Sequence, residues 1–380
     1  MILMHCRIPW WSLISAVGKE EAVANTVFIL GAGASKDAGV PMMGEFLDVA
    51  GDLYKRGDVG LSEVQLEFQK VFQGMASLSK AHSKADLDFQ NVESIFAAFE
   101  MGKLLGGFGD YDRAGMESLV SAMRTLIVKT IEKTMRFPAK PVPPPPYDRL
   151  MQLVDFLLSK ANPRQTLAFI TFNYDLALDV SFSLKGLTPE YGLDSLQSLP
   201  VRGAIPLLKL HGSLNWGICP KCKFIVPLEI KNALRSTGWE PIPGTEQGRL
   251  EIGAHLKILQ HCGTTCLPEP MIVPPTWNKA GYHYQVSPVW ARAARELKEA
   301  ENIFVIGYSL PQSDFFFKYL YGLGTVGEKI LRRFWVIDPD PSGEVMSRFE
   351  ALLGPGARQR FKPLKKTFKD AVSEIQKEFE

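Results

Sequence analysis

The sequence predicts an α/β protein: a Rossmann-like parallel sheet that carries a helical insert and a small zinc-ribbon module. Three observations favour this fold class. Short apolar runs, partly β-branched, recur along the chain, and most of them end in a polar motif. A long stretch between the first two runs has helical periodicity and almost no strand signal. Two close pairs of cysteines lie between later runs, as in a structural metal site.

The first half of the chain holds one expected strand and then helices. Residues 27–30 are apolar and end in glycines, which suits a buried parallel strand. Helical spacing follows over 45–54, and apolar residues recur every three or four positions from about 61 to 133. The proline tract at 141–146 fits neither a helix nor a central strand and marks a linker. We therefore expect a helical insert over 61–147.

Strand signals return in the second half, at residues 166–171, 206–210, 271–273, 302–306 and 334–337. Ligands bind beyond the carboxyl ends of the strands in an open parallel sheet, so the polar motifs that follow these runs predict one cleft lined by several loops. The predicted division is a sheet domain (22–60, 148–215 and 268–356), a zinc-ribbon module with an insertion (216–267) and a C-terminal helix (357–380).

Composition narrows the class of protein. The chain has 380 residues, a net charge of +2 and 46% apolar residues, which is ordinary for a globular protein and argues against direct nucleic-acid binding. No apolar run approaches the ~20 residues that cross a bilayer, so no membrane contact is expected. Paired cysteines indicate metal binding in a reducing compartment, and we predict a cytoplasmic protein.

A glycine turn follows the first strand, with Gly31, Ala32, Gly33 and Ser35. Glycines let a backbone approach a pyrophosphate, and a following helix offers unpaired N–H groups. Lys36 stands where a dinucleotide fingerprint has its third glycine, and no second strand with an acidic end follows, which argues against a dehydrogenase. The chain has no P-loop sequence. A tight turn without a ligand is the alternative.

The cysteine pairs predict structural zinc. Cys219, Cys222, Cys262 and Cys266 offer four thiolates for a closed tetrahedral site, which leaves no open position for catalysis by the metal. The spacing between the pairs is longer than usual, and the second pair is CxxxC. An insertion explains the first departure, and His255 or His261 can replace one thiolate. Free core cysteines are the alternative.

Two further polar motifs complete the pattern: Asn173 and Asp175 in Thr-Phe-Asn-Tyr-Asp, and His211 in Lys-Leu-His-Gly-Ser. Singly, they read as helix caps and a core histidine. With the glycine turn before them and the cysteine pairs after them, they resemble the sirtuins, a family of NAD-consuming enzymes. The resemblance implies that Asn173 holds the nicotinamide ribose and a water, His211 is the general base, and Asp175 shapes the nicotinamide pocket.

The resemblance extends to the last two strand ends. Gly307 and Ser309 fall where sirtuins contact the adenosine ribose, and Asp338 falls where they hold the adenine side. A turn and a helix cap are the alternative interpretations of these residues. The resemblance covers the sheet domain and the ribbon, while the helical insert matches only loosely.

The sequence departs from sirtuins that deacylate proteins. Residues 39–46 lack their Gly-Ile-Pro-Asp-Phe-Arg motif, and residues 271–278 contain two prolines where they pair with an acyl-lysine peptide. The Gly-Tyr-Ser-Leu motif at 307–310 resembles divergent sirtuin-like domains of bacterial antiviral systems. That implies hydrolysis of NAD+ to nicotinamide and ADP-ribose, gated through a homo-oligomer, a HerA-type ATPase or an Argonaute-like partner.

Three other activities stay open from the sequence. They are NAD-dependent protein deacylation, NAD or ADP-ribose binding without catalysis by a regulatory subunit, and formation of a cyclic product, which differs from hydrolysis only in the acceptor nucleophile.

Overall fold

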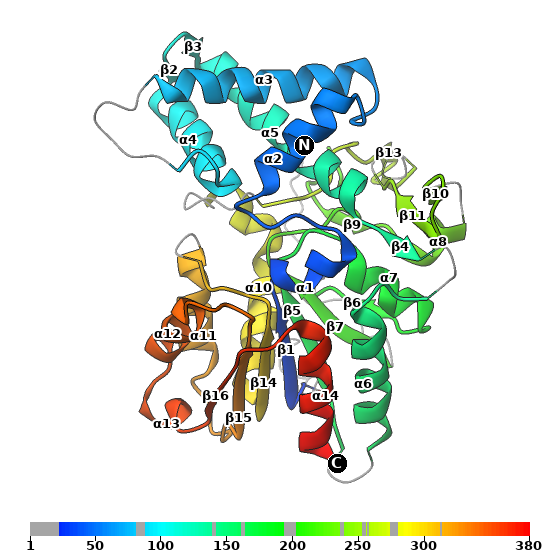
Figure 1. Ribbon diagram of the computed structural model, residues 1–380, viewed down its shortest axis with the longest axis vertical. Coiled ribbons are helices and arrows are strands. Elements are labelled where there is room, and N and C mark those ends of the chain that lie inside the picture. Colours follow the sequence, from blue (N-terminus) through cyan, green and yellow to red (C-terminus); the bar gives the residue numbers. More distant parts are fainter. Residues whose placement is uncertain are drawn as a thin grey trace, which may run out of the picture.

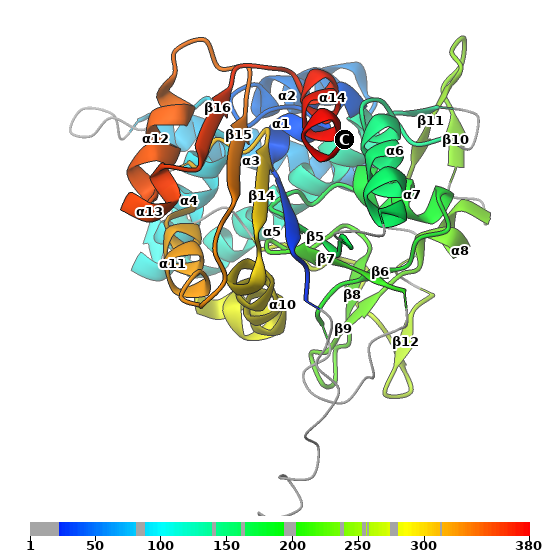
Figure 2. The same ribbon diagram turned by 90° about the horizontal axis from the view of Figure 1, so that it is seen from below.

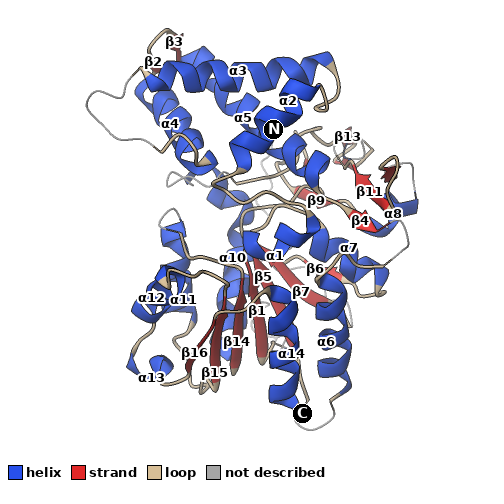
Figure 3. Cartoon of the chain, viewed as in Figure 1, coloured by secondary structure: helices blue, strands red, loops and turns tan. Residues whose placement is uncertain are grey.

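The structure is a computed structural model that describes residues 23–80, 88–138, 142–160, 164–193, 203–235, 239–252, 256, 258–273, 280–311 and 314–380. Its elements fall into a parallel α/β sheet with flanking helices, a group of helices above it, and a smaller part made of short strands (Figures 1 and 3). No helix in the described part of the chain combines the length and the apolar character needed to cross a membrane.

A seven-stranded sheet with every pairing parallel forms the centre of the fold, which confirms the predicted fold class. Across the sheet its strands are β16 (Phe361–Leu364), β15 (Arg333–Ile337), β14 (Asn302–Ile306), β1 (Thr26–Leu30), β5 (Leu167–Thr171), β7 (Ile205–Lys209) and β6 (Pro189–Glu190). The chain builds outward from β1 in one direction and from β14 in the other. The strand order therefore reverses between β1 and β14, where open α/β sheets bind their ligands.

Helices cover both faces of this sheet. Successive strand residues point to opposite faces, and here the residues on both faces are apolar and buried. Val27 and Ile29 of β1 belong to one buried cluster, and Phe28 and Leu30 belong to another. Figure 2 shows the two helical layers. One contains α6 (Tyr147–Ser159), α7 (Ala177–Leu184) and α14 (Phe368–Phe379), and the other contains α10 (Ala280–Glu299), α11 (Phe315–Gly324) and α12 (Glu344–Leu352).

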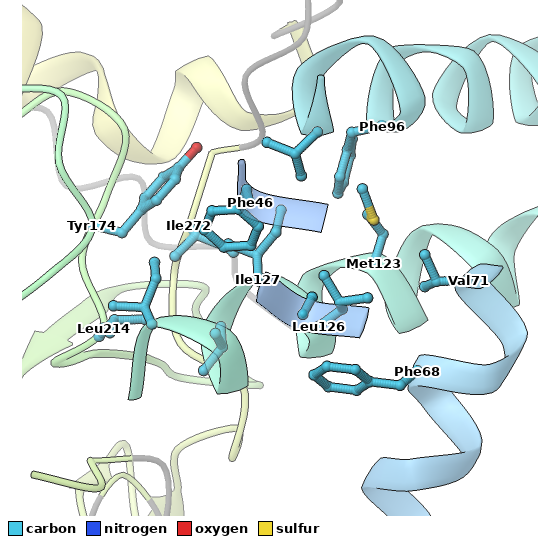
Figure 4. Close-up of a cluster of buried hydrophobic side chains, with 14 of the residues drawn as sticks. Phe46, Phe68, Val71, Phe96, Met123, Leu126, Ile127, Tyr174, Leu214 and Ile272 are labelled. Atoms are coloured by element: carbon cyan, nitrogen blue, oxygen red, sulfur yellow. The ribbon is translucent and has the colours of Figure 1, made fainter. Parts of the chain in front are cut away.

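The predicted insert is helical, with α3 (Ser62–Ser79), α4 (Val92–Leu105) and α5 (Arg113–Thr134). A small hairpin, β2 (Gly107–Phe108) and β3 (Tyr111–Asp112), joins the last two helices. Helix α2 (Phe46–Arg56), which the sequence division placed in the sheet domain, packs against α3 and α5. Figure 4 shows the resulting core, which extends from the helices to Tyr174 and Ile272 on the sheet side.

The cysteine-bearing segment contains two short hairpins, β8 (Trp216–Ile218) with β9 (Ile225–Pro227) and β12 (Gln260–His261) with β13 (Thr264–Thr265). Between them the chain makes α8 (Ile230–Arg235), β10 (Trp239–Pro241) and β11 (Gln247–Leu250). Strand β11 pairs with β4 (Phe137–Pro138), which follows the helical insert. The extra length between the cysteine pairs therefore contacts the end of that insert.

Two regions differ from the sequence prediction. Residues 271–273 do not join the main sheet; within the described residues they make one isolated bridge, between Ile272 and Gly212. The segment from 357 to 380 is more than a helix: the short helix α13 (Pro355–Arg358) leads into β16, and α14 follows. Strand β16 carries Lys362 and Pro363, which are tolerated because it lies at the edge of the sheet.

Candidate active site

A pocket of about 240 Å³ lies beyond the carboxyl ends of the central strands, between the sheet and the helical insert. Its wall contains residues that follow β1, β5, β7, β14 and β15, as the repeated strand-then-polar pattern predicts. Seven of the ten predicted catalytic and cofactor-binding residues line it: Ala32, Asn173, Asp175, His211, Gly307, Ser309 and Asp338. The other three, Gly31, Gly33 and Ser35, are not among its described lining residues.

The glycines of the first turn serve the contact between two loops. A Cβ on Gly31 would lie 2.5 Å from the carbonyl oxygen of Gly307, and one on Gly307 would lie 2.5 Å from the backbone nitrogen of Ala34. The N–H of Gly33 donates to the Gly307 oxygen at 2.9 Å. Helix α1 (Ala32–Ser35) is a single turn. The turn thus packs against the Gly-Tyr-Ser motif, and it reaches the pocket through Ala32.

Asn173 is oriented by the same turn. Its side-chain nitrogen donates to the carbonyl oxygen of Gly31 at 2.9 Å and to the hydroxyl of Ser35 at 3.0 Å. A carbonyl oxygen accepts but cannot donate, so the amide nitrogen must face Gly31. Ser35 is fully buried and also bonds the hydroxyl of Tyr147 at 2.9 Å. With its nitrogen fixed to the scaffold, Asn173 offers the pocket its side-chain oxygen, which accepts hydrogen bonds.

Asp175 lies over a buried ionic network. Its carboxylate accepts from the N–H of Ala177 at 2.9 Å, which is an Asx-turn bond just before α7, whose N-cap is Leu176. Burial raises the pKa of Asp175, and the nearby charge of Lys209 opposes that rise. Lys209 donates to the carbonyl oxygen of Asp175 at 2.6 Å and to the carboxylate of Asp179 at 2.8 Å. The lysine of the Lys-Leu-His-Gly-Ser motif therefore ties β7 to the Asn-Tyr-Asp loop.

The backbone after β7 fixes His211. Gly212 has a φ of +82°, and a Cβ there would lie 2.1 Å from the carbonyl oxygen of Met271. This close approach lets the N–H of Ser213 donate to Met271 at 2.9 Å, and the N–H of Val273 donate to His211 at 2.7 Å. A glycine after the histidine is therefore required by packing.

The imidazole of His211 is 4% exposed and lies among aromatic rings. Phe172 meets it edge-on at 5.1 Å, and the ring of Tyr174 is centred 6.1 Å away. Its Nε2 lies 3.2 Å from a carboxylate oxygen of Asp314, which also lines the pocket.

The last two strand ends contribute turns as well as pocket wall. Gly307 has a φ of +61°, a backbone conformation that favours glycine. The carboxylate of Asp338 accepts from the N–H of Asp340 at 2.9 Å, so the turn interpretation applies to it. Burial raises the pKa of Asp338. Ser309 lies beside them in the pocket wall.

Sequence reasoning missed the pocket residues that come from the helical insert and the segment before it. Glu93 on α4, Ile127 and Ile131 on α5, and the segment with Met42, Met43 and Phe46 all line the pocket. Helical periodicity marked the apolar ones as core, and nothing in the sequence connected them to the strand ends. Asp314 lies four residues after the Gly-Tyr-Ser-Leu motif and was given no role from the sequence.

The charge of the pocket is distinctly acidic. Its described lining residues include four carboxylates and neither lysine nor arginine: Glu93, Asp175, Asp314 and Asp338. His211 is the one basic side chain among them. Such a wall favours a ligand with a cationic part, and it leaves the binding of anionic groups to backbone N–H groups.

Three of the four predicted cysteine ligands come together. Cys219, Cys222 and Cys262 form a group with His261 in which all ligand atoms lie within 4.8 Å of one another. Cys266 is buried and is not part of the group, and His255 lies outside the described residues.

The donor set and its spacing suit zinc. With Zn–S bonds of about 2.3 Å, tetrahedral geometry separates two sulfurs by ~3.8 Å. The Sγ atoms of Cys222 and Cys262 are 3.7 Å apart, and each lies 3.3 Å from Nδ1 of His261. Hydrogen bonding, led by the backbone N–H of Cys222, lowers the pKa of Cys219 to about 6, which favours the thiolate that a metal requires.

Comparison with known proteins gave a result only among solved structures. No family model and no curated protein matches the chain. A Sir2 homologue in complex with NAD is 15% identical, with 93% of this chain and 89% of that chain covered and a TM-score of 0.42. A Sir2 homologue mutant in complex with ADP-ribose is 15% identical, with 93% of this chain and 92% of that chain covered and a TM-score of 0.37. A Sir2 protein bound to a propionylated peptide is 12% identical, with 93% of this chain and 92% of that chain covered and a TM-score of 0.33. All three of these structures are of Sir2 proteins.

Proposed function

We propose that the chain is a sirtuin-like NAD+ hydrolase that cleaves the nicotinamide–ribose bond and releases nicotinamide and ADP-ribose. One observation carries the proposal: Asn173, Asp175 and His211, from the ends of two adjacent strands, meet in one pocket whose other charged groups are carboxylates. An acceptor amide, a base and an acidic wall are what this reaction needs.

The reaction follows from these groups. The C–N bond to nicotinamide breaks with its electron pair going to the ring nitrogen, which neutralises the pyridinium and leaves an oxocarbenium-like sugar. Asn173 holds a ribose hydroxyl or the attacking water with its side-chain oxygen. His211 takes the proton that water loses as the new C–O bond forms. The four carboxylates of the pocket wall stabilise the cation electrostatically.

The region beside His211 favours water over a peptide as the acceptor. The backbone N–H and C=O of Met271 bond to Trp216 and Ser213, and those of Val273 bond to His211 and Tyr174. A peptide that added a strand along 271–273 would therefore have at most Ile272 to pair with. This observation ranks protein deacylation below hydrolysis.

The zinc site and the gating belong to the same proposal. Zinc held by Cys219, Cys222, Cys262 and His261 would stabilise the small module, and four protein ligands leave it no place in the reaction. Activity gated by assembly of the chain, by a HerA-type ATPase or by an Argonaute-like partner in bacterial anti-phage defence follows from the sequence resemblance.

The test is nicotinamide release from NAD+ by the purified chain, by Asn173→Ala and by His211→Ala. Asn232→Ala is a matched control, because Asn232 lies on α8 outside the pocket and bonds to Glu229. With the gate open, in the assembled chain or with its partner present, we expect turnover in the parent and the control, loss of about 10²-fold or more in both pocket variants, and linear ADP-ribose as product. Acetylated ADP-ribose formed from an acetyl-lysine peptide would favour the deacylase, and cyclic ADP-ribose would favour cyclisation. Tight NAD+ binding without turnover under any trigger would favour the regulatory subunit.

A further inference from the structure

The carboxylate of Asp314 faces the imidazole of His211 inside the pocket. Its Oδ1 lies 3.2 Å from Nε2 of His211, and both side chains are 4% exposed. We propose that Asp314 is a positioning residue for His211: it accepts the Nε2 proton, sets the tautomer of the neutral ring, and stabilises the imidazolium that forms during turnover. The proposal deepens the hydrolase function proposed above and rests on it for the catalytic part.

The place of Asp314 in the fold does not otherwise explain its orientation. It is the N-cap residue of α11, a position where aspartate ordinarily accepts a hydrogen bond from the first turn of the helix. In the described part of the chain its side chain makes no such capping bond. The two carboxylate oxygens instead contact His211 and Tyr308.

The second oxygen of the carboxylate is held as well. Tyr308 donates its hydroxyl to Oδ2 of Asp314 at 3.1 Å. The tyrosine ring is stacked on Phe172 at 4.2 Å with an interplanar angle of 7°, and Phe172 in turn meets His211 edge-on. Burial raises the pKa of Tyr308, which keeps its hydroxyl protonated as a donor. Asp314 is therefore fixed at both oxygens, and its distance to His211 is set by packed aromatic rings.

The chemical consequence follows from valence. A neutral imidazole carries one N–H, so the proton that Asp314 accepts from Nε2 leaves the lone pair on Nδ1. When water attacks the sugar, its proton passes to Nδ1 and the ring becomes a cation beside a carboxylate. The pair attracts strongly because little water screens it. The proton leaves to solvent after nicotinamide departs, so that NAD+ and water give nicotinamide, ADP-ribose and H+.

Other titratable groups surround the same pocket, and the test must separate Asp314 from them. They come from four places: α4 of the insert, the loops after β5 and β14, and the end of β15. These groups are Glu93, Tyr174, Asp175, Tyr308 and Asp338. All of them stay in place when Asp314 alone is changed, so a change in the tautomer of His211 in that variant reports on Asp314.

The test uses Asp314→Asn in the full chain, with histidine labelled by 15N and no nucleotide present. The amide keeps the size of the carboxylate but presents an N–H to Nε2, which forces the ring into the other tautomer. We expect the parent to show the Nε2–H pattern at His211 and the variant to show the Nδ1–H pattern; His211→Ala identifies the signals. Glu296→Gln is the matched control, because Glu296 is a fully buried carboxylate that pairs with Arg292 at 2.6 Å outside the pocket. It should leave the His211 signals unchanged.

Kinetics supply the second arm. Asp314→Asn should lower kcat for nicotinamide release by about 10²-fold or more, with the KM for NAD+ changed far less. An Nδ1–H tautomer in the parent overturns the proposal without any variant, and so does an unchanged tautomer in Asp314→Asn. Failure of the parent to release nicotinamide under any trigger counts against the hydrolase function, while the tautomer measurement still decides the role of Asp314.

Discussion

We expect Lys209→Met to destabilise the protein by about 3–5 kcal/mol, because it leaves a carboxylate buried without its cation. The side chains of Lys209 and Asp179 are 1% and 0% exposed, and their charged atoms lie 2.8 Å apart. Methionine has a similar length and is apolar, so it fills the space without supplying a charge. Asp179 keeps the hydroxyl of Tyr191 at 2.7 Å, which satisfies one oxygen but does not neutralise the charge.

A double variant separates the charge effect from simple loss of packing. Lys209→Met combined with Asp179→Asn removes both charges, and the amide oxygen still accepts from Tyr191. The remaining cost is an amide N–H and the carbonyl of Asp175 without partners, about 1–3 kcal/mol in all. The double variant should therefore be more stable than Lys209→Met alone.

Urea unfolding followed by tryptophan fluorescence measures these free energies of unfolding. A loss below about 1 kcal/mol in Lys209→Met would refute the reasoning, because a buried unpaired carboxylate cannot be so cheap. Additive losses in the double variant would refute it equally, since they would mean that the two side chains do not interact.

Three further predictions concern the turn, the metal and the pocket charge. In urea titrations, Gly212→Ala should lower the free energy of unfolding clearly more than Gly203→Ala does. Both glycines have a positive φ, which costs an alanine about 1–2 kcal/mol, but only at Gly212 does the new Cβ meet a backbone oxygen. Equal losses would contradict this. His261→Ala should lose bound zinc, whereas Cys266→Ser should keep one zinc per chain. Metal analysis of protein purified without chelator measures both. The reverse pattern would favour the predicted site with four cysteine ligands. Glu93→Gln should weaken NAD+ binding by about 3–10-fold in calorimetry (about 0.7–1.4 kcal/mol). ADP-ribose binding should be nearly unchanged, because ADP-ribose lacks the nicotinamide cation. An equal loss for both ligands would show that Glu93 does not face the nicotinamide end of NAD+.

The sequence was sufficient to predict the sheet strands whose signal is local. Residues 27–30, 166–171 and 302–306 are buried on both faces and read as continuous apolar runs, so each was recognisable alone. Strand β16 was not, because an edge strand with a lysine and a proline has no such run. Residues 271–273 have the right composition but bond to Gly212 and its neighbours, which only the folded chain reveals.

The same distinction applies to the pocket. Asn173 and His211 were found because each follows a strand, and parallel strands bring their carboxyl ends to one edge. Glu93 lies on a helix that is far in the sequence from the strands of the main sheet. Its place in the pocket therefore depends on how the helical insert packs against the sheet. Asp314 lies at the start of α11 beside His211, a contact that depends on how that helix packs against the strand ends. Ser35 had the right motif, but its hydroxyl is turned inward to Tyr147.

Strand β1 lies between two strands that come much later in the sequence, β5 and β14, which bears on how the protein folds. Its Thr26 pairs with Leu167 on one side and with Asn302 on the other. During synthesis one edge of β1 stays open until β5 has left the ribosome, and the other edge stays open far longer, because β14 is made so much later. Loop closure over such separations makes folding slow, and open apolar strand edges are prone to association. A chain that ends before β14 therefore leaves one edge of a buried apolar strand open, and we expect it to aggregate.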